Sequence, residues 1–132
     1  MTNTLSAWIN IVASDVNNLH IRINREHPFT DIIYEALREH EVECIRGNIL
    51  DIYILDGKLH VNAFVSTDLG SIDNYKKVLS ESGIFKGKWD AELIDYSCNT
   101  VQGIDIILED KEAQTHFVKL MKLYGLKELV ER

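Results

Sequence analysis

Polar side chains that could take part in chemistry recur at alternate positions along three predicted strands. The candidates are His20 and Arg22 on one strand, Asp51 on a second and His60 on a third. A histidine beside an aspartate can act as a general base, and an arginine can hold an anionic group. These four residues would form a polar pocket on an open sheet face. Such a pocket would belong to a small-molecule-binding domain or a small enzyme.

The same sheet face also has the composition of a surface that binds another protein. Apolar and aromatic groups with polar neighbours are typical of interaction sites. The predicted partner-binding residues are Ile49, Asp51, Tyr53, His60, Asn62 and Phe64. The alternative is that another segment of the chain covers this face.

The motifs of other familiar chemistries do not occur in the sequence. There is no HExxH or EF-hand spacing, no GxGxxG or GxxxxGK[ST] loop and no GxSxG. The run from His40 to Cys44 holds several potential metal ligands, but no second pair completes a four-ligand set. We therefore expect no metal and no cofactor, and the sequence favours a binding protein over an enzyme.

The charge of the chain limits the kinds of partner. The net charge is −7, and the acidic excess lies entirely before Glu109. A nucleic acid or an anionic membrane attracts the opposite sign, so neither is an expected partner. A basic protein is compatible with this charge, and so is a homodimer through the open face. The sequence thus favours a small acidic protein-binding module of the inhibitor, immunity or chaperone-like kind.

Cysteine use and hydropathy indicate the compartment. The two cysteines, Cys44 and Cys98, lie far apart in apolar stretches, where a reduced, buried thiol is common. The N-terminus does not have the basic start and apolar run of a signal peptide, and no apolar run is long enough to span a membrane. We expect one soluble, cytoplasmic domain over residues 1–132.

A β-hairpin is the strongest local signal. The runs Ile49 to Leu55 and Lys58 to Ser66 flank Asp56-Gly57, a pair suited to a type I′ turn. With that turn, Tyr53 faces His60 across the hairpin. Strand alternation then predicts a core face made of Leu50, Ile52, Ile54, Leu59, Val61, Ala63 and Val65.

Apolar spacing predicts three helices. They cover about 30–40, 71–82 and 110–124, with Thr30, Ser71 and Asp110 as N-caps. A final turn at 126–130 would follow the third helix. Further strands are expected at 7–13, 19–24, 90–98 and 104–109.

The resulting order is ββα three times, which predicts an α+β fold with one mixed or antiparallel sheet and three helices. Equivalent apolar positions of the helices recur every 42 residues, as in Ile33, Tyr75 and Phe117. This spacing indicates a ββα repeat. Residues 19–98 also read βαββαβ, the ferredoxin-like order. Both arrangements remain open at this point.

Overall fold

A computed structural model describes residues 9–13, 20–23, 27–38, 50–65, 70–98 and 101–125. Its six strands form one sheet in the order β1-β2-β3-β4-β6-β5, in which every neighbouring pair is antiparallel. The strands are β1 Ile9–Ala13, β2 His20–Ile23, β3 Leu50–Leu55, β4 Lys58–Val65, β5 Trp89–Cys98 and β6 Val101–Leu108. The helices are α2 Pro28–Ala36, α3 Ile72–Glu81 and α4 Lys111–Leu123. The α+β class is confirmed.

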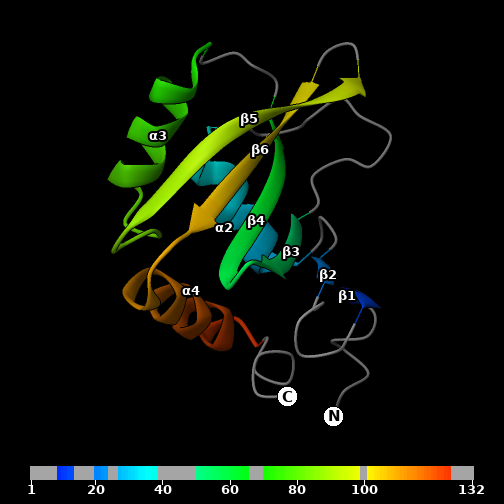
Figure 1. Ribbon diagram of the computed structural model, residues 1–132, viewed down its shortest axis with the longest axis vertical. Helices are drawn as coiled ribbons and strands as arrows, with labels where there is room; N and C mark the ends of the chain where they lie inside the picture. The colour runs from blue at the N-terminus through cyan, green and yellow to red at the C-terminus, as the bar shows by residue number, and fades with distance from the viewer. Residues whose placement is uncertain are drawn as a thin grey trace.

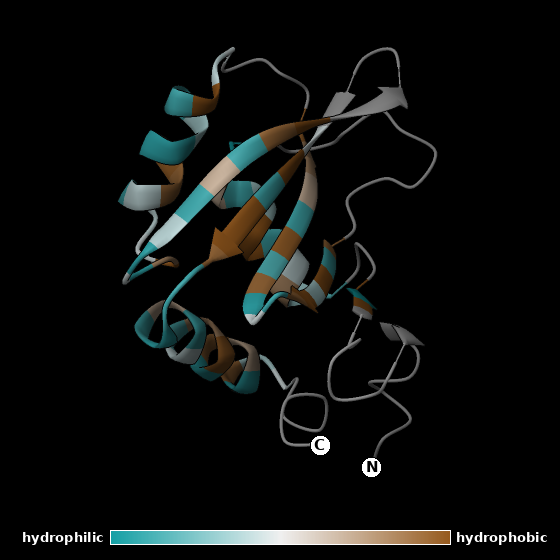
Figure 2. Ribbon diagram, viewed as in Figure 1, coloured by the Kyte–Doolittle hydropathy of each residue, from teal (hydrophilic) through white to brown (hydrophobic). Residues whose placement is uncertain are grey.

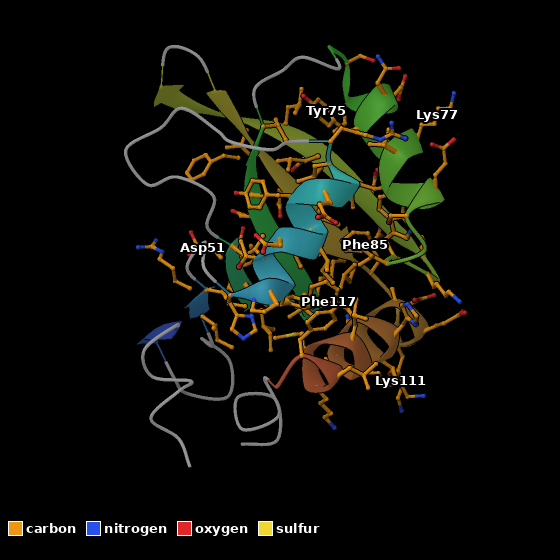
Figure 3. The ribbon with its side chains drawn as sticks, turned by 180° about the vertical axis from the view of Figure 1, so that it is seen from behind. Asp51, Tyr75, Lys77, Phe85, Lys111 and Phe117 are labelled. Atoms are coloured by element: carbon orange, nitrogen blue, oxygen red, sulfur yellow. The ribbon has the colours of Figure 1, made fainter. Side chains whose placement is uncertain are left out.

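The helices leave one face of the sheet uncovered by any described helix. Seen from that face, β4, β5 and β6 lie in front, with α2 behind the sheet and α3 beside β5 (Figure 1). From behind, α2 crosses the sheet and α4 lies next to it (Figure 3). We call the side without described helices the open face. Hydrophilic and hydrophobic residues alternate along β4, as a strand with two different faces requires (Figure 2).

The predicted hairpin is confirmed in its turn, its register and its core face. Asp56 and Gly57 have φ angles of 52° and 75°, the left-handed values that a type I′ turn needs. The pairing of Tyr53 with His60 is the predicted one. Six of the seven predicted core residues are buried, and Ile54 is partly buried.

The first helix begins two residues before its predicted cap. His27 is the N-cap, and its Nδ1 accepts a hydrogen bond of 3.0 Å from the backbone N–H of Phe29. Proline suits the first helical position because its φ is already helical and it has no N–H to satisfy, so Pro28 starts the helix. The prediction of Thr30 as N-cap was therefore wrong, and Thr30 is buried inside the helix.

The other two helices begin where the sequence predicts. Ser71 is the N-cap of α3, and Asp110 is the N-cap of α4, where its side chain accepts from the backbone N–H of Ala113. The predicted final turn at 126–130 lies outside the described residues.

An aromatic cluster joins the helices beneath the sheet. The ring of Phe117 lies 5.4 Å from that of Phe29 and 5.7 Å from that of Phe85, and Phe29 also contacts Tyr124. Figure 3 shows Phe85 and Phe117 between α2 and α4. Six residues in or capping the helices recur at the 42-residue interval, and all are buried: Ile33, Leu37, Tyr75, Leu79, Phe117 and Met121.

The topology decides between the two predicted arrangements only in part. In a ferredoxin-like sheet, strands joined through a helix lie parallel, whereas β2 and β3, on either side of α2, are antiparallel neighbours. The ferredoxin-like arrangement was therefore wrong. The observed element order is ββα three times, but β6 instead of β5 pairs with β4. That the three units are structural repeats stays a prediction.

Candidate functional site

A row of polar residues crosses the open face from one strand to the next. Register pairs Arg22 with Asp51, Asp51 with Asn62, Asn62 with Asp105 and Asp105 with Glu92. Directly opposite residues of an antiparallel sheet have side chains close enough to interact. Five strands therefore bring these side chains together, although they are up to 83 positions apart in the chain. We call this set the polar row.

One end of the polar row is an ion pair between β2 and β3. Nε of Arg22 donates to Oδ1 of Asp51 at 2.8 Å, and Nη2 donates to Oδ2 at 3.3 Å. Both side chains are half-buried, and the hydrogen bond to Asp51 raises the pKa of Arg22 further above neutrality. A two-point pair of this kind fixes the plane of the guanidinium. The Arg22 side chain is thus held by Asp51.

The centre of the row is a buried group of three side chains. Asp105 is 6% exposed and His60 is 7% exposed. Nδ1 of His60 lies 3.0 Å from both carboxylate oxygens of Asp105, and Nδ2 of Asn62 donates to Oδ1 at 2.8 Å. An ionised carboxylate only accepts hydrogen bonds, so the Nδ1 of His60 carries the proton in this arrangement. Nε2 is then the ring's remaining acceptor.

Tyr53 completes this group from the neighbouring strand. Its ring stacks on the His60 ring, with centroids 4.9 Å apart and planes within 9°. Its hydroxyl donates a long hydrogen bond of 3.5 Å to Oδ1 of Asn62. Burial is the largest cause that raises the pKa of Tyr53, followed by the negative charge of Asp105. Asp51 and Glu92 also raise it, so the phenol lies in a negative field.

The structure brings together most of the residues predicted for the open face. Asp51, Tyr53, His60 and Asn62 occupy adjacent places on β3 and β4. Arg22 joins Asp51, whereas the partner of His60 is Asp105. The backbone of His20 pairs with Tyr53, and its side chain lies outside the described part. Ile49 also lies outside the described residues.

Phe64 differs from its expected exposure. It is only 6% exposed, so the prediction of an exposed phenylalanine was wrong. Its cross-strand neighbour on β6 is Gly103. The backbone N–H of Phe64 donates to the hydroxyl of Tyr34 at 2.9 Å. This residue thus belongs to the packed interior.

Sequence reasoning missed Asp105 and Glu92, which lie on the last two strands of the sheet. Asp105 stands alone in an apolar run, Ile104 to Leu108. A lone acid in a strand that reads as buried requires a hydrogen-bonding partner, because an unpaired buried charge is very costly. That signal was present, but its partner depended on the strand order.

The described part of the chain contains no group of three or more His, Cys, Asp or Glu side chains that could hold a metal ion. The run from His40 to Cys44 lies outside it. Within the same described residues, no helix is long and apolar enough to cross a membrane. Comparison with protein-family models, curated proteins and solved structures found no match to the chain.

Proposed function

We propose that the chain is a small non-enzymatic module of the inhibitor, immunity or chaperone-like kind that binds a basic protein through the open face. The observation that carries this proposal is the half-buried ring of Tyr53, which is stacked on the buried, hydrogen-bonded group of His60, Asp105 and Asn62. These side chains are fixed before any partner arrives. Binding through fixed side chains costs less conformational entropy than binding through mobile ones.

The charges of the face favour a cationic partner. The side chain of Glu92 is exposed and forms no hydrogen bond or ion pair with another described residue. It lies beside Asp105, and both carboxylates act on the Tyr53 hydroxyl. A lysine or arginine of the partner could pair with Glu92 and contact the tyrosine ring. Because the face is acidic, a nucleic acid or an anionic membrane is not an expected partner. We infer a cytoplasmic location from the sequence.

A second candidate function is supported by the protonation pattern of His60. With Nδ1 held by Asp105, Nε2 could accept a proton or a hydrogen bond from a small ligand. In this alternative, Asp105 is a positioning residue, and the chain is a small-molecule-binding domain or a small enzyme. A binding protein is favoured because Arg22, the expected anion-holding group, is already paired with Asp51.

The experiment is quantitative affinity capture from cells of the source organism with three forms of the protein. Glu92→Lys reverses a charge on the open face, and Glu81→Lys makes the same net change on the exposed end of α3. We expect a basic protein that is captured by the wild type and by Glu81→Lys, but lost with Glu92→Lys. Equal loss with both variants would mean that net charge alone is responsible, and the proposal would fail.

Light scattering on the wild type and on Glu92→Lys tests the homodimer. A dimer that Glu92→Lys dissociates would replace the separate partner by a second copy of the chain. A monomer of both forms leaves the open face to another protein.

A further inference from the structure

The helical side of the molecule contains a groove that is separate from the open face. It lies between α2, α4 and the turn after α3, and its volume is about 480 Å³. Its apolar lining comes from Ile32 and Ala36 on α2, Ile84 in the turn, and Leu120 and Tyr124 on or just after α4. The ring of Tyr124 contacts Phe29 below it, so the aromatic cluster supports the floor.

Some polar groups of the groove already form hydrogen bonds within the protein, and others do not. The hydroxyl of Ser82 donates to the carbonyl of Leu79 at 2.6 Å and accepts from the N–H of Ile84, so it stabilises the turn. The side chains of Glu35 and His116, on opposite walls, form no hydrogen bond or ion pair with another described residue. They remain able to pair with a ligand.

An exposed leucine extends the apolar surface of the groove. Leu123 is 81% exposed, the highest value among the large hydrophobic residues of the described part. Residues three apart on a helix are neighbours on its surface, so Leu123 lies beside Leu120. An apolar side chain that protrudes next to an apolar groove is typical of a contact made with another molecule.

The groove has an acidic group on its α2 wall. Glu35 lines the groove, and Asp31, one turn before it on the same helix, is also an exposed acid. The α4 wall is lined by His116 and Leu120. A helix lying between the walls would be favoured by a basic residue on its α2 side.

We propose that this groove binds an amphipathic helix of a partner protein, with its apolar stripe against Ile32, Ala36 and Leu120 and a lysine or arginine against Glu35. Helix-in-groove recognition uses apolar anchors at helical spacing, which two antiparallel or crossing helices can receive between them. This surface does not include the polar row, so the inference does not depend on the proposed function. The protein would then carry two docking surfaces.

The test uses a fluorescent synthetic peptide of about 18 residues, long enough to be helical when bound, with leucine at helical spacing and lysine elsewhere. Ala36→Arg places a large cation in the groove, and Ser80→Arg makes the same charge change on the exposed side of α3. We expect Ala36→Arg to weaken binding about tenfold or more, and Ser80→Arg to change it less than about twofold. Urea unfolding verifies that both variants fold.

Three further measurements distinguish binding of the peptide in the groove from its general electrostatic attraction to the acidic protein. Glu35→Lys is expected to weaken the lysine peptide about threefold or more, and a leucine–glutamate peptide of the same pattern is expected to bind at least about tenfold more weakly. When the peptide is added to the protein, the changes in backbone amide NMR chemical shifts are expected to centre on Ile84 and Leu120. Glu92→Lys is expected to leave the affinity for the peptide unchanged. Equal effects of Ala36→Arg and Ser80→Arg, or shifts centred on the open face, would overturn the inference.

Discussion

Replacement of Asp105 by leucine tests whether the centre of the polar row is a real structural unit. Asp105 accepts from Nδ1 of His60 at 3.0 Å and from Nδ2 of Asn62 at 2.8 Å, and it is almost fully buried. Leucine has a similar size but accepts no hydrogen bond, so both donors lose their acceptor. Leaving one buried donor unsatisfied costs about 1–3 kcal/mol.

Two effects make the expected loss of unfolding free energy smaller than the full cost of leaving two buried donors unsatisfied. Asn62 is half-buried and can be hydrated, and His60 can move its proton to Nε2. Removing the buried carboxylate also removes the free-energy cost of its desolvation in the folded protein, which offsets part of the loss. We therefore expect Asp105→Leu to lower the free energy of unfolding by about 2 kcal/mol.

The assay is urea unfolding followed by tryptophan fluorescence, with the dependence on denaturant compared between the proteins. Asp105→Asn is the matched control. Its carbonyl can keep the bond to Asn62, while its amide can donate to Nδ1 of the other His60 tautomer, so a loss of about 1 kcal/mol or less is expected. The reasoning is refuted if Asp105→Leu is within about 0.5 kcal/mol of the wild type, or if the two variants are equally destabilised.

Three further predictions concern His27, two glycines and Tyr53. Burial lowers the pKa of His27, whose ordinary value is 6.5, so stability from its neutral form is complete above pH 6.5 and decreases as the pH falls below it. This decrease is measured as unfolding free energy against pH. Gly83→Ala is expected to cost about 1–2 kcal/mol in urea unfolding, because φ there is +75° and nothing else lies near the added carbon. Gly87→Ala is expected to cost clearly more, since its Cβ would lie 2.7 Å from the backbone nitrogen of Ala113 as well. Burial and the nearby carboxylates raise the pKa of Tyr53, so its tyrosinate absorbance is expected to develop with a midpoint above pH 10.

Each of these predictions has its own control. His27→Asn keeps a good N-cap without a titrating group, and it should flatten the pH dependence relative to the wild type. An unchanged slope would contradict the role given to His27. Equal losses for Gly83→Ala and Gly87→Ala would contradict the steric argument. The Tyr53 midpoint is taken from the difference between the wild type and Tyr53→Phe, and a midpoint at or below pH 10 would contradict the negative field.

The parts of the fold that depend on local pattern were predictable from the sequence. Asp56-Gly57 determines the hairpin register, and that register alone places Tyr53 opposite His60. The interval of three to four residues between apolar positions was enough to find all three helices. The start of α2 was missed because His27 and Pro28 begin it, whereas serine, threonine and aspartate are the usual capping residues and Thr30 lies nearby.

The parts that depend on strand order were not predictable. Asp105 meets Asn62 only because β6 inserts between β4 and β5, and no local pattern specifies that insertion. The pairing of His60 with Asp105 and the position of Glu92 beside Asp105 follow from the same strand order. Strand alternation alone also did not predict the burial of Phe64, which shares a side of β4 with Asn62. Sequence reasoning therefore found three residues of the polar row and missed the other two.

The central claim is that the open face binds a basic protein, and calorimetry with the captured and purified partner tests it most directly. Tyr53→Ala removes the stacked ring of the open face, and Lys77→Ala removes an exposed side chain from α3, outside both proposed docking surfaces. We predict that Tyr53→Ala weakens binding about 30-fold, as expected for a central aromatic contact, while Lys77→Ala changes it less than about twofold. Full affinity of a correctly folded Tyr53→Ala protein, or a larger loss with Lys77→Ala, would contradict the account.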